Sequence, residues 1–206
     1  MNRMNAGGEN RDWFIFGTAA AALLTLLSYH HSATAPGGAL RLRAENRARE
    51  NVSAWPEPSR RMAALLIERH GPPDRRAPGL LAWNQRKPWK RIAVLRAPSD
   101  SPLEQTLSYD VPPGRIAPLL AFGRGVSVNP DAWELSAQAD GEAGVFLKLN
   151  LADDIAQGRL SPEEAEAVYR KVSRLRSAGK SSPYTEGLLF PAIFGDRPAF
   201  AYRTMF

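Results

Sequence analysis

The sequence predicts an α+β fold, with one N-terminal transmembrane helix followed by a small domain of short antiparallel strands with helices packed on it. Three observations lead to this prediction. The stretch from Trp13 to Tyr29 is uncharged and apolar. Short segments of apolar character are bounded by Gly, Pro and Asn turns. Finally, Ser161-Pro162-Glu163-Glu164 has the form of a helix capping box.

The apolar stretch is the first element of the chain. As a helix it is roughly 25 Å long, a little short of a hydrocarbon core of about 30 Å, so flanking residues must complete the span. Aromatic residues at both ends favour the membrane interface. The candidate membrane residues are Trp13, Phe14, Phe16, Gly17, Ala21 and Tyr29, of which Gly17 and Ala21 form a small-xxx-small pair. Ala33-Thr34-Ala35 also fits a signal-peptidase site, but Pro36 directly after it favours an uncleaved anchor.

Basic residues on both sides of the stretch bear on its orientation. Arg41, Arg43, Arg47 and Arg49 outnumber the basic residues before it, and the positive-inside rule then favours a cytoplasmic domain. An N-terminal anchor that follows a short tail commonly exports the rest of the chain, however. We therefore expect a single-pass protein of the bacterial inner membrane with a periplasmic domain.

The chain divides into five segments. They are a tail (1–12), the span (13–29), a juxtamembrane linker (30–54), the α+β domain (55–179) and an extended aromatic and proline-rich tail (180–206). The linker is rich in Arg and Glu and has little to bury, so it is interpreted as a solvated spacer. The alternative is that its arginines bind anionic headgroups.

Turn residues and periodicity divide the domain into elements. Helices are expected from Ser59, as N-cap, to Arg69, over 116–122, over 142–157 and from Pro162 to Gly179. Strands are expected over 79–85, 91–96, 103–111, 126–128 and 133–139. The segment 142–157 fits both a strand and a helical face, and its length favours a helix.

The composition limits the classes of function. The formal net charge of +6 suggests an acidic partner, which could be anionic lipid, a cell-envelope polymer, an acidic protein face or nucleic acid. Nucleic acid is not expected for an exported domain. The absence of cysteine excludes disulfides, thiolate catalysis and cysteine metal sites.

Two groups of residues are candidates for binding a partner or ligand. The first is the hairpin set Trp83, Arg86, Lys87, Trp89, Lys90 and Arg91. Its indoles could stack on a ligand while its cations contact anionic groups. In the alternative, the Trp residues face the core and the charges face water. The second group is the tail set Tyr184, Leu188, Phe190 and Phe194. An apolar tail must be covered, either by this domain or by a partner.

The sequence offers little for catalysis. None of the H-E-x-x-H, G-x-S-x-G and P-loop motifs occurs, and no two histidines have helix-face metal spacing. Asn150, Asp153 and Asp154 could hold a hard cation or act as a carboxylate pair, but a solvated helix face explains them more simply. We expect no catalytic residue, no cofactor and no metal.

Several short motifs resemble those of a family of small uncharacterised bacterial envelope proteins, many with signal-peptide or lipoprotein N-termini. They are Tyr109-Asp110-Val111-Pro112-Pro113 with Glu104-Gln105, Trp83 with Pro88-Trp89-Lys90-Arg91, Asn150-Leu151-Ala152-Asp153-Asp154-Ile155, and Ser182-Pro183-Tyr184-Thr185 with Gly187-Leu188. The resemblance covers about 59–190, and it implies an envelope location and no known reaction.

These observations predict a membrane-anchored, non-enzymatic accessory subunit of a larger bacterial membrane assembly. It would dock through its single span and apolar tail, with the lipid bilayer and a membrane protein complex as partners. The second hypothesis is a tethered binder of anionic lipid or envelope polymer through the Trp/Arg/Lys hairpin. The third is a carboxylate-dependent enzyme.

Overall fold

The structure is a computed structural model, and it describes residues 36–96 and 100–193. The chain separates into two compact units, residues 1–46 and 47–206, and only the second contains the sheet. Within the described ranges, no helix combines the length and the apolar character needed to cross a bilayer. This finding corrects the predicted single-span fold class and the membrane, single-pass and signal-anchor assignment.

The physical reason for this correction lies in the described helices themselves. The longest two, α2 (Pro36–Asn51) and α6 (Pro162–Ser177), are rich in Arg and Glu, and the apolar α4 (Pro113–Phe122) is too short. The predicted span (13–29) lies outside the described residues, as do the candidate membrane residues Trp13, Phe14, Phe16, Gly17, Ala21 and Tyr29. The expected inner-membrane location therefore depends on residues that the structure does not describe.

The second unit begins within the predicted linker, which is helical up to Asn51 in α2. Ala48, Val52 and Trp55 are buried and belong to the core, so the end of this segment is not a solvated spacer. Helix α3 (Glu57–His70) starts directly after Pro56. Pro58 lies in its first turn, where proline is tolerated. Ser59, the predicted N-cap, lies inside α3 and donates a 2.8 Å hydrogen bond to the Leu95 carbonyl.

All neighbouring strands of the six-stranded sheet are antiparallel, in the order β1-β2-β3-β4-β6-β5. The strands are β1 (Arg75–Ala77), β2 (Leu80–Arg86), β3 (Trp89–Leu95), β4 (Leu103–Ser108), β5 (Val126–Asn129) and β6 (Glu134–Ala139). The predicted β2–β3 hairpin is present, but its wide loop over 86–90 is not, because Arg86 and Trp89 pair and leave only Lys87 and Pro88 in the turn. Strand β1 was not predicted, because three residues with two arginines carry no apolar alternation.

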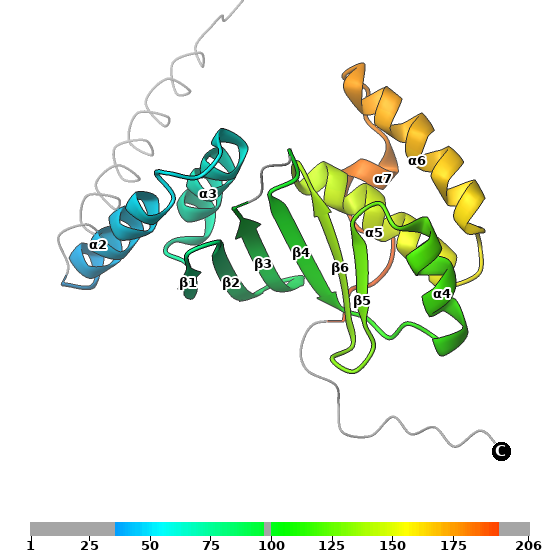
Figure 1. Ribbon diagram of the computed structural model, residues 1–206, viewed down its shortest axis with the longest axis horizontal. Coiled ribbons are helices and arrows are strands. Elements are labelled where there is room, and N and C mark those ends of the chain that lie inside the picture. Colours follow the sequence, from blue (N-terminus) through cyan, green and yellow to red (C-terminus); the bar gives the residue numbers. More distant parts are fainter. Residues whose placement is uncertain (1–35, 97–99, 194–206) are drawn as a thin grey trace, which may run out of the picture. The chain divides into compact units, whose positions relative to one another are not determined.

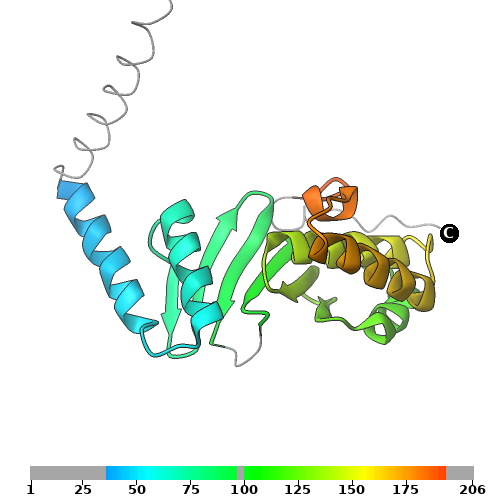
Figure 2. The same cartoon turned by 90° about the horizontal axis from the view of Figure 1, so that it is seen from above.

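One face of the sheet is apolar and is covered by helices. Its residues include Leu81, Trp83, Ile92, Leu103, Leu107 and Leu135, all fully buried. Helices α3 and α5 (Glu142–Ala156) pack on this face, and Figure 1 shows the strands in front of α5. Figure 2 shows α4, α6 and α7 (Pro183–Glu186) gathered around α5 at one end of the sheet, with α3 at the other. The predicted 142–157 helix is confirmed.

The opposite face of the sheet carries most of its polar side chains, together with the small buried residues Ala82 and Ala93. Thr106 and Ser136 pair across β4 and β6, with 2.9 Å between their hydroxyl oxygens. Glu134 lies 3.1 Å from the Lys90 ammonium and 3.7 Å from the Arg91 guanidinium. This face is therefore tied together by polar contacts between strands.

Candidate functional site

The two tryptophans of the predicted binding hairpin are buried. Trp83 is fully buried and donates from Nε1 to the Gly71 carbonyl at 2.9 Å, which ties β2 to the end of α3. Trp89 is 4% exposed, and its ring stacks on Phe146 of α5 with 5.9 Å between centroids. Neither indole is available for stacking on a ligand, so the hairpin has the alternative arrangement with its Trp residues in the core.

The cations of the same hairpin lie at the surface, and ion pairs are formed by Arg86, Lys90 and Arg91. Arg86 lies 3.2 Å from Asp74, and Arg91 lies 3.6 Å from Glu104. Lys90 contacts Glu134, as described above, and Lys87 is exposed. The structure thus separates the cations from the indoles, and no joint aromatic and cationic surface forms.

The predicted tail packs on its own domain as far as residue 193. We call residues 183–193 the C-terminal strap. Its anchor is Asn150 of α5, which is 2% exposed. Asn150 Nδ2 donates to the carbonyls of Tyr184 (3.1 Å) and Gly187 (2.8 Å), and its Oδ1 accepts from the Leu189 amide (2.8 Å). One buried side chain therefore holds three backbone groups of the strap.

Aromatic and apolar residues complete this attachment. Tyr184, Leu188 and Phe190 are partly buried against the core. The Phe190 ring meets the Tyr109 ring edge-on at 5.6 Å. Phe194, the fourth predicted tail residue, lies outside the described residues. Three of the four side chains proposed to contact a partner are thus used within the domain.

The two carboxylates considered for catalysis hold the strap and the loop before α6. Arg159 forms ion pairs with both Asp153 and Asp154. Tyr109 donates its hydroxyl to Asp153 at 2.5 Å, and Tyr184 donates to Asp154 at 2.7 Å. We call these five residues the carboxylate clasp. No described group of His, Asp and Glu residues is arranged to hold a metal ion.

The clasp raises the pKa of both of its phenols. Burial, and then the hydrogen bond to Asp153, raise the pKa of Tyr109 above its ordinary value. The same two causes, with Asp154 as acceptor, raise the pKa of Tyr184 to about 12. Both phenols therefore stay protonated near neutral pH and act as hydrogen-bond donors. This is a structural arrangement rather than a pair of free catalytic carboxylates.

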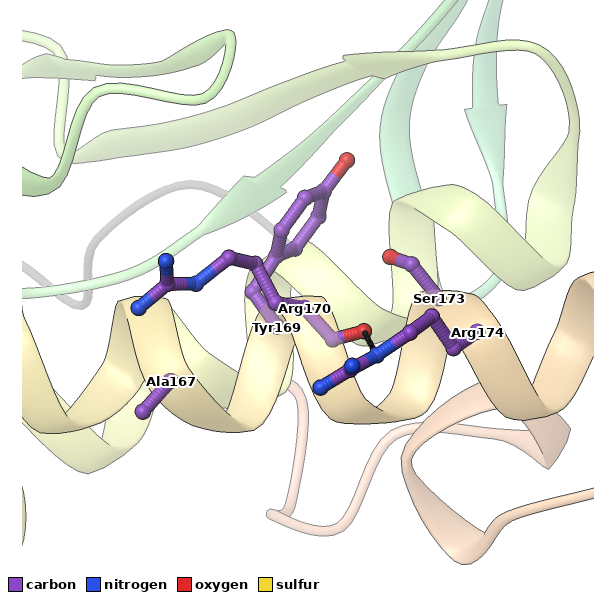
Figure 3. Close-up of a pocket in the computed structure, with 5 residues that line it drawn as sticks. All are labelled: Ala167, Tyr169, Arg170, Ser173 and Arg174. Atoms are coloured by element: carbon purple, nitrogen blue, oxygen red, sulfur yellow. Dashed lines mark hydrogen bonds between the residues drawn. The ribbon is translucent and has the colours of Figure 1, made fainter.

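A groove along α6 is the feature that sequence reasoning missed. It has a volume of about 580 Å³ and is lined by Ala167, Tyr169, Arg170, Ser173 and Arg174. Figure 3 shows Tyr169 and Ser173 pointing to the same side of the helix. Arg170 and Arg174 are exposed, and the Arg174 Nε donates to the Arg170 carbonyl at 3.3 Å. The groove therefore presents two guanidinium groups beside an aromatic ring.

The sequence did contain a signal for this groove. Basic residues are concentrated in the second half of α6, where Arg170, Lys171, Arg174 and Arg176 follow an acidic first turn. That distribution also suits the helix dipole, because cations are favourable near the C-terminal end of a helix. Only the packed structure shows that part of this basic run borders a hollow.

Comparison of the chain with protein-family models, with curated proteins and with solved structures found no match. Nothing in these comparisons bears on the resemblance to bacterial envelope proteins, which stays a prediction.

Proposed function

We propose that this chain is a non-enzymatic accessory protein that holds an acidic protein segment of a neighbouring subunit in the groove on α6. The observation that carries this proposal is the pair of exposed arginines beside that groove. The Arg170 side chain is 65% exposed, and its nearest carboxylate, that of Glu166, is a loose 3.6 Å away. A pair of this kind contributes little by itself, so the guanidinium can exchange Glu166 for a carboxylate of the partner.

The other parts of the domain support a binding role rather than a chemical one. The carboxylates of the clasp already accept hydrogen bonds from Tyr109 and Tyr184 and pair with Arg159. The indoles of the hairpin are packed in the core, which removes the aromatic part of the second hypothesis. The groove on α6 is therefore a better candidate for meeting an acidic partner than the hairpin.

The test is binding of a fluorescein-labelled decaglutamate peptide to the full chain, followed by fluorescence anisotropy. We expect binding that weakens as salt rises, because screening shortens the range of the charges. The double variant Arg170→Glu/Arg174→Glu places like charges against the peptide and should weaken binding at least about tenfold.

The matched control is Arg75→Glu/Arg76→Glu on β1, where both side chains are exposed. It changes the net charge by the same amount, away from α6, and should weaken binding by less than about threefold. Equal losses in the two double variants would mean that only overall charge matters, and the proposal would be wrong. Absence of binding at low salt would have the same consequence.

A further inference from the structure

Lys148 is an ammonium group that is buried without a carboxylate partner. It lies on α5 and is 8% exposed, so more than nine-tenths of it is buried. Its Nζ donates to the Gln138 carbonyl, and the described part of the chain offers it no carboxylate oxygen within 4.0 Å. A buried charge is costly unless it is paired, so this arrangement calls for an explanation.

The charged groups around Lys148 do not compensate for the cost of burying its ammonium. Burial lowers the pKa of Lys148, which reflects the unfavourable placement of the charge. Asp140 acts in the opposite direction, while Arg176 and Arg124 reinforce the lowering. The carboxylate of Asp140 is already held by Arg176, with contacts of 3.0 and 2.5 Å. Asp140 therefore cannot serve Lys148 as a dedicated partner.

Lys148 forms one wall of a polar hollow that adjoins the groove on α6. The hollow has a volume of about 290 Å³ and is lined by Ser101, Arg124, Gly125, Gln138, Lys148 and Tyr169. Tyr169 lines both this hollow and the groove. The Arg124 guanidinium lies 5.0 Å from the centre of that ring. The hollow thus brings hydroxyl, guanidinium and ammonium donors together.

Gly125 keeps this hollow open next to the ammonium. Its φ of +75° favours glycine. A Cβ at this position would lie 3.2 Å from the Gln138 carbonyl oxygen and 3.6 Å from Lys148 Nζ. A larger residue would therefore crowd the ammonium and fill part of the space beside it.

The charge and the size of the hollow together define its ligand. Arg124 is paired with Glu166, so the uncompensated charge is the single positive charge of Lys148. A carboxylate carries one negative charge, whereas a phosphate monoester carries about −1.5 to −2 at pH 7. A volume of about 290 Å³ is just below the roughly 300–1,000 Å³ of pockets that take drug-sized ligands. The hollow is therefore suited to one monoanionic end group.

We infer that this hollow is a carboxylate-binding pocket, in which Lys148 Nζ and the hydroxyl of Tyr169 donate to one carboxylate of the acidic partner. The inference rests on the proposed function, because the carboxylate enters from the groove on α6. The outer arginines attract the acidic segment, and the pocket receives one of its side chains.

The experiment uses the full chain with ¹³C-labelled lysine and follows the Lys148 signals by NMR, assigned by their loss in Lys148→Met. Sodium acetate is titrated at constant ionic strength, with sodium chloride and inorganic phosphate as comparison titrations. We expect a saturable shift of the Lys148 signals and a rise of its pKa with acetate. We also expect Tyr169→Phe to weaken acetate binding, and Lys171→Met, at an exposed position of α6, to leave it unchanged.

Two results would overturn the inference. The first is a Lys148 signal that follows ionic strength alone, with no saturation by acetate. The second is tighter binding of phosphate than of acetate, which would contradict the assignment of a monoanion.

Decaglutamate binding separates failure of the pocket from failure of the groove. Lys148→Met should weaken it at least about tenfold, because a hydrogen-bonded charge is lost. Loss of binding in Arg170→Glu/Arg174→Glu but not in Lys148→Met would refute the pocket and leave the groove. A saturable shift of the Lys148 signals with acetate, together with peptide binding that is unchanged in Arg170→Glu/Arg174→Glu, would refute the groove and leave the pocket.

Discussion

Replacement of Asn150 by leucine tests the role of the C-terminal strap. Leucine has the same branching and the same number of side-chain heavy atoms as asparagine but can make none of the three hydrogen bonds to the backbone of Tyr184, Gly187 and Leu189. A typical intramolecular hydrogen bond contributes about 0.5–1.5 kcal/mol net. Loss of three such bonds at a buried position should therefore lower the free energy of unfolding by about 2–4 kcal/mol. For a chain of this size, that corresponds to a fall in Tm of roughly 5–15 °C.

The same substitution should expose the strap before the whole domain unfolds. A cost of about 2 kcal/mol on the closed strap raises the open population roughly thirtyfold. Chymotrypsin cleavage after Tyr184 or Leu188 should accelerate by a similar factor, since proteolysis follows the open population when opening is fast. Urea unfolding followed by circular dichroism gives the global value, and mass spectrometry of the digest locates the cleavage.

Asn84→Leu provides the matched control, because Asn84 is an exposed asparagine on β2. It should change stability by less than about 0.5 kcal/mol and leave the strap resistant to protease. If Asn150→Leu unfolds at the same urea concentration as the unsubstituted chain and its strap is cut no faster, Asn150 does not hold the strap and the reasoning is wrong.

The remaining predictions concern the clasp and the packing of α5. Because the folded state raises the pKa of both clasp tyrosines, to about 12 for Tyr184, the unfolded state loses their protons first. The stability that the phenols contribute should be complete below about pH 10 and fall as pH rises toward the folded pKa. In the double variant Tyr109→Phe/Tyr184→Phe, the urea midpoint should therefore fall less between pH 8 and 11 than it does in the unsubstituted chain. An equal fall in both proteins would contradict this prediction. Gly144→Ala should cost about 1–3 kcal/mol in thermal unfolding, because its Cβ would lie 2.8 Å from Asp140 Oδ1 and 2.9 Å from Ala139 Cβ. Gly114→Ala in α4 is its control, because a Cβ added there would meet no atom of another element within 4 Å, and equal effects of the two substitutions would refute the crowding argument.

The most local parts of the fold were the most predictable. The capping box at Ser161 has both of its hydrogen bonds, 3.2 Å and 2.8 Å long, because every group involved lies within four residues. The β2–β3 hairpin also followed from alternation and turn residues. By contrast, 142–157 had no single periodicity, because α5 packs against the sheet on one side and α6 and α7 on the other. A helix that is buried all round carries apolar residues at nearly every position.

The single-span prediction shows a different limit of sequence reasoning. It was drawn from one apolar stretch, Trp13 to Tyr29, and the described helices contain no element that could cross a bilayer. The fold class of the described chain is an α+β domain with a six-stranded antiparallel sheet. Hydropathy reports how apolar a segment is, but not which surface covers it.

The sequence by itself determined the elements whose signals lie within a few residues, together with the net positive charge. Only the tertiary structure decided what the individual polar groups do. It placed both hairpin indoles in the core, joined Asp153 and Asp154 to the strap, and brought Arg124 of the α4–β5 loop beside Lys148 of α5 and Tyr169 of α6. The lone lysine in the apolar run around Leu147 and Leu149 was the one sequence signal of that pocket. Its meaning depends on contacts between residues far apart in the chain, which are set by packing and not by local pattern.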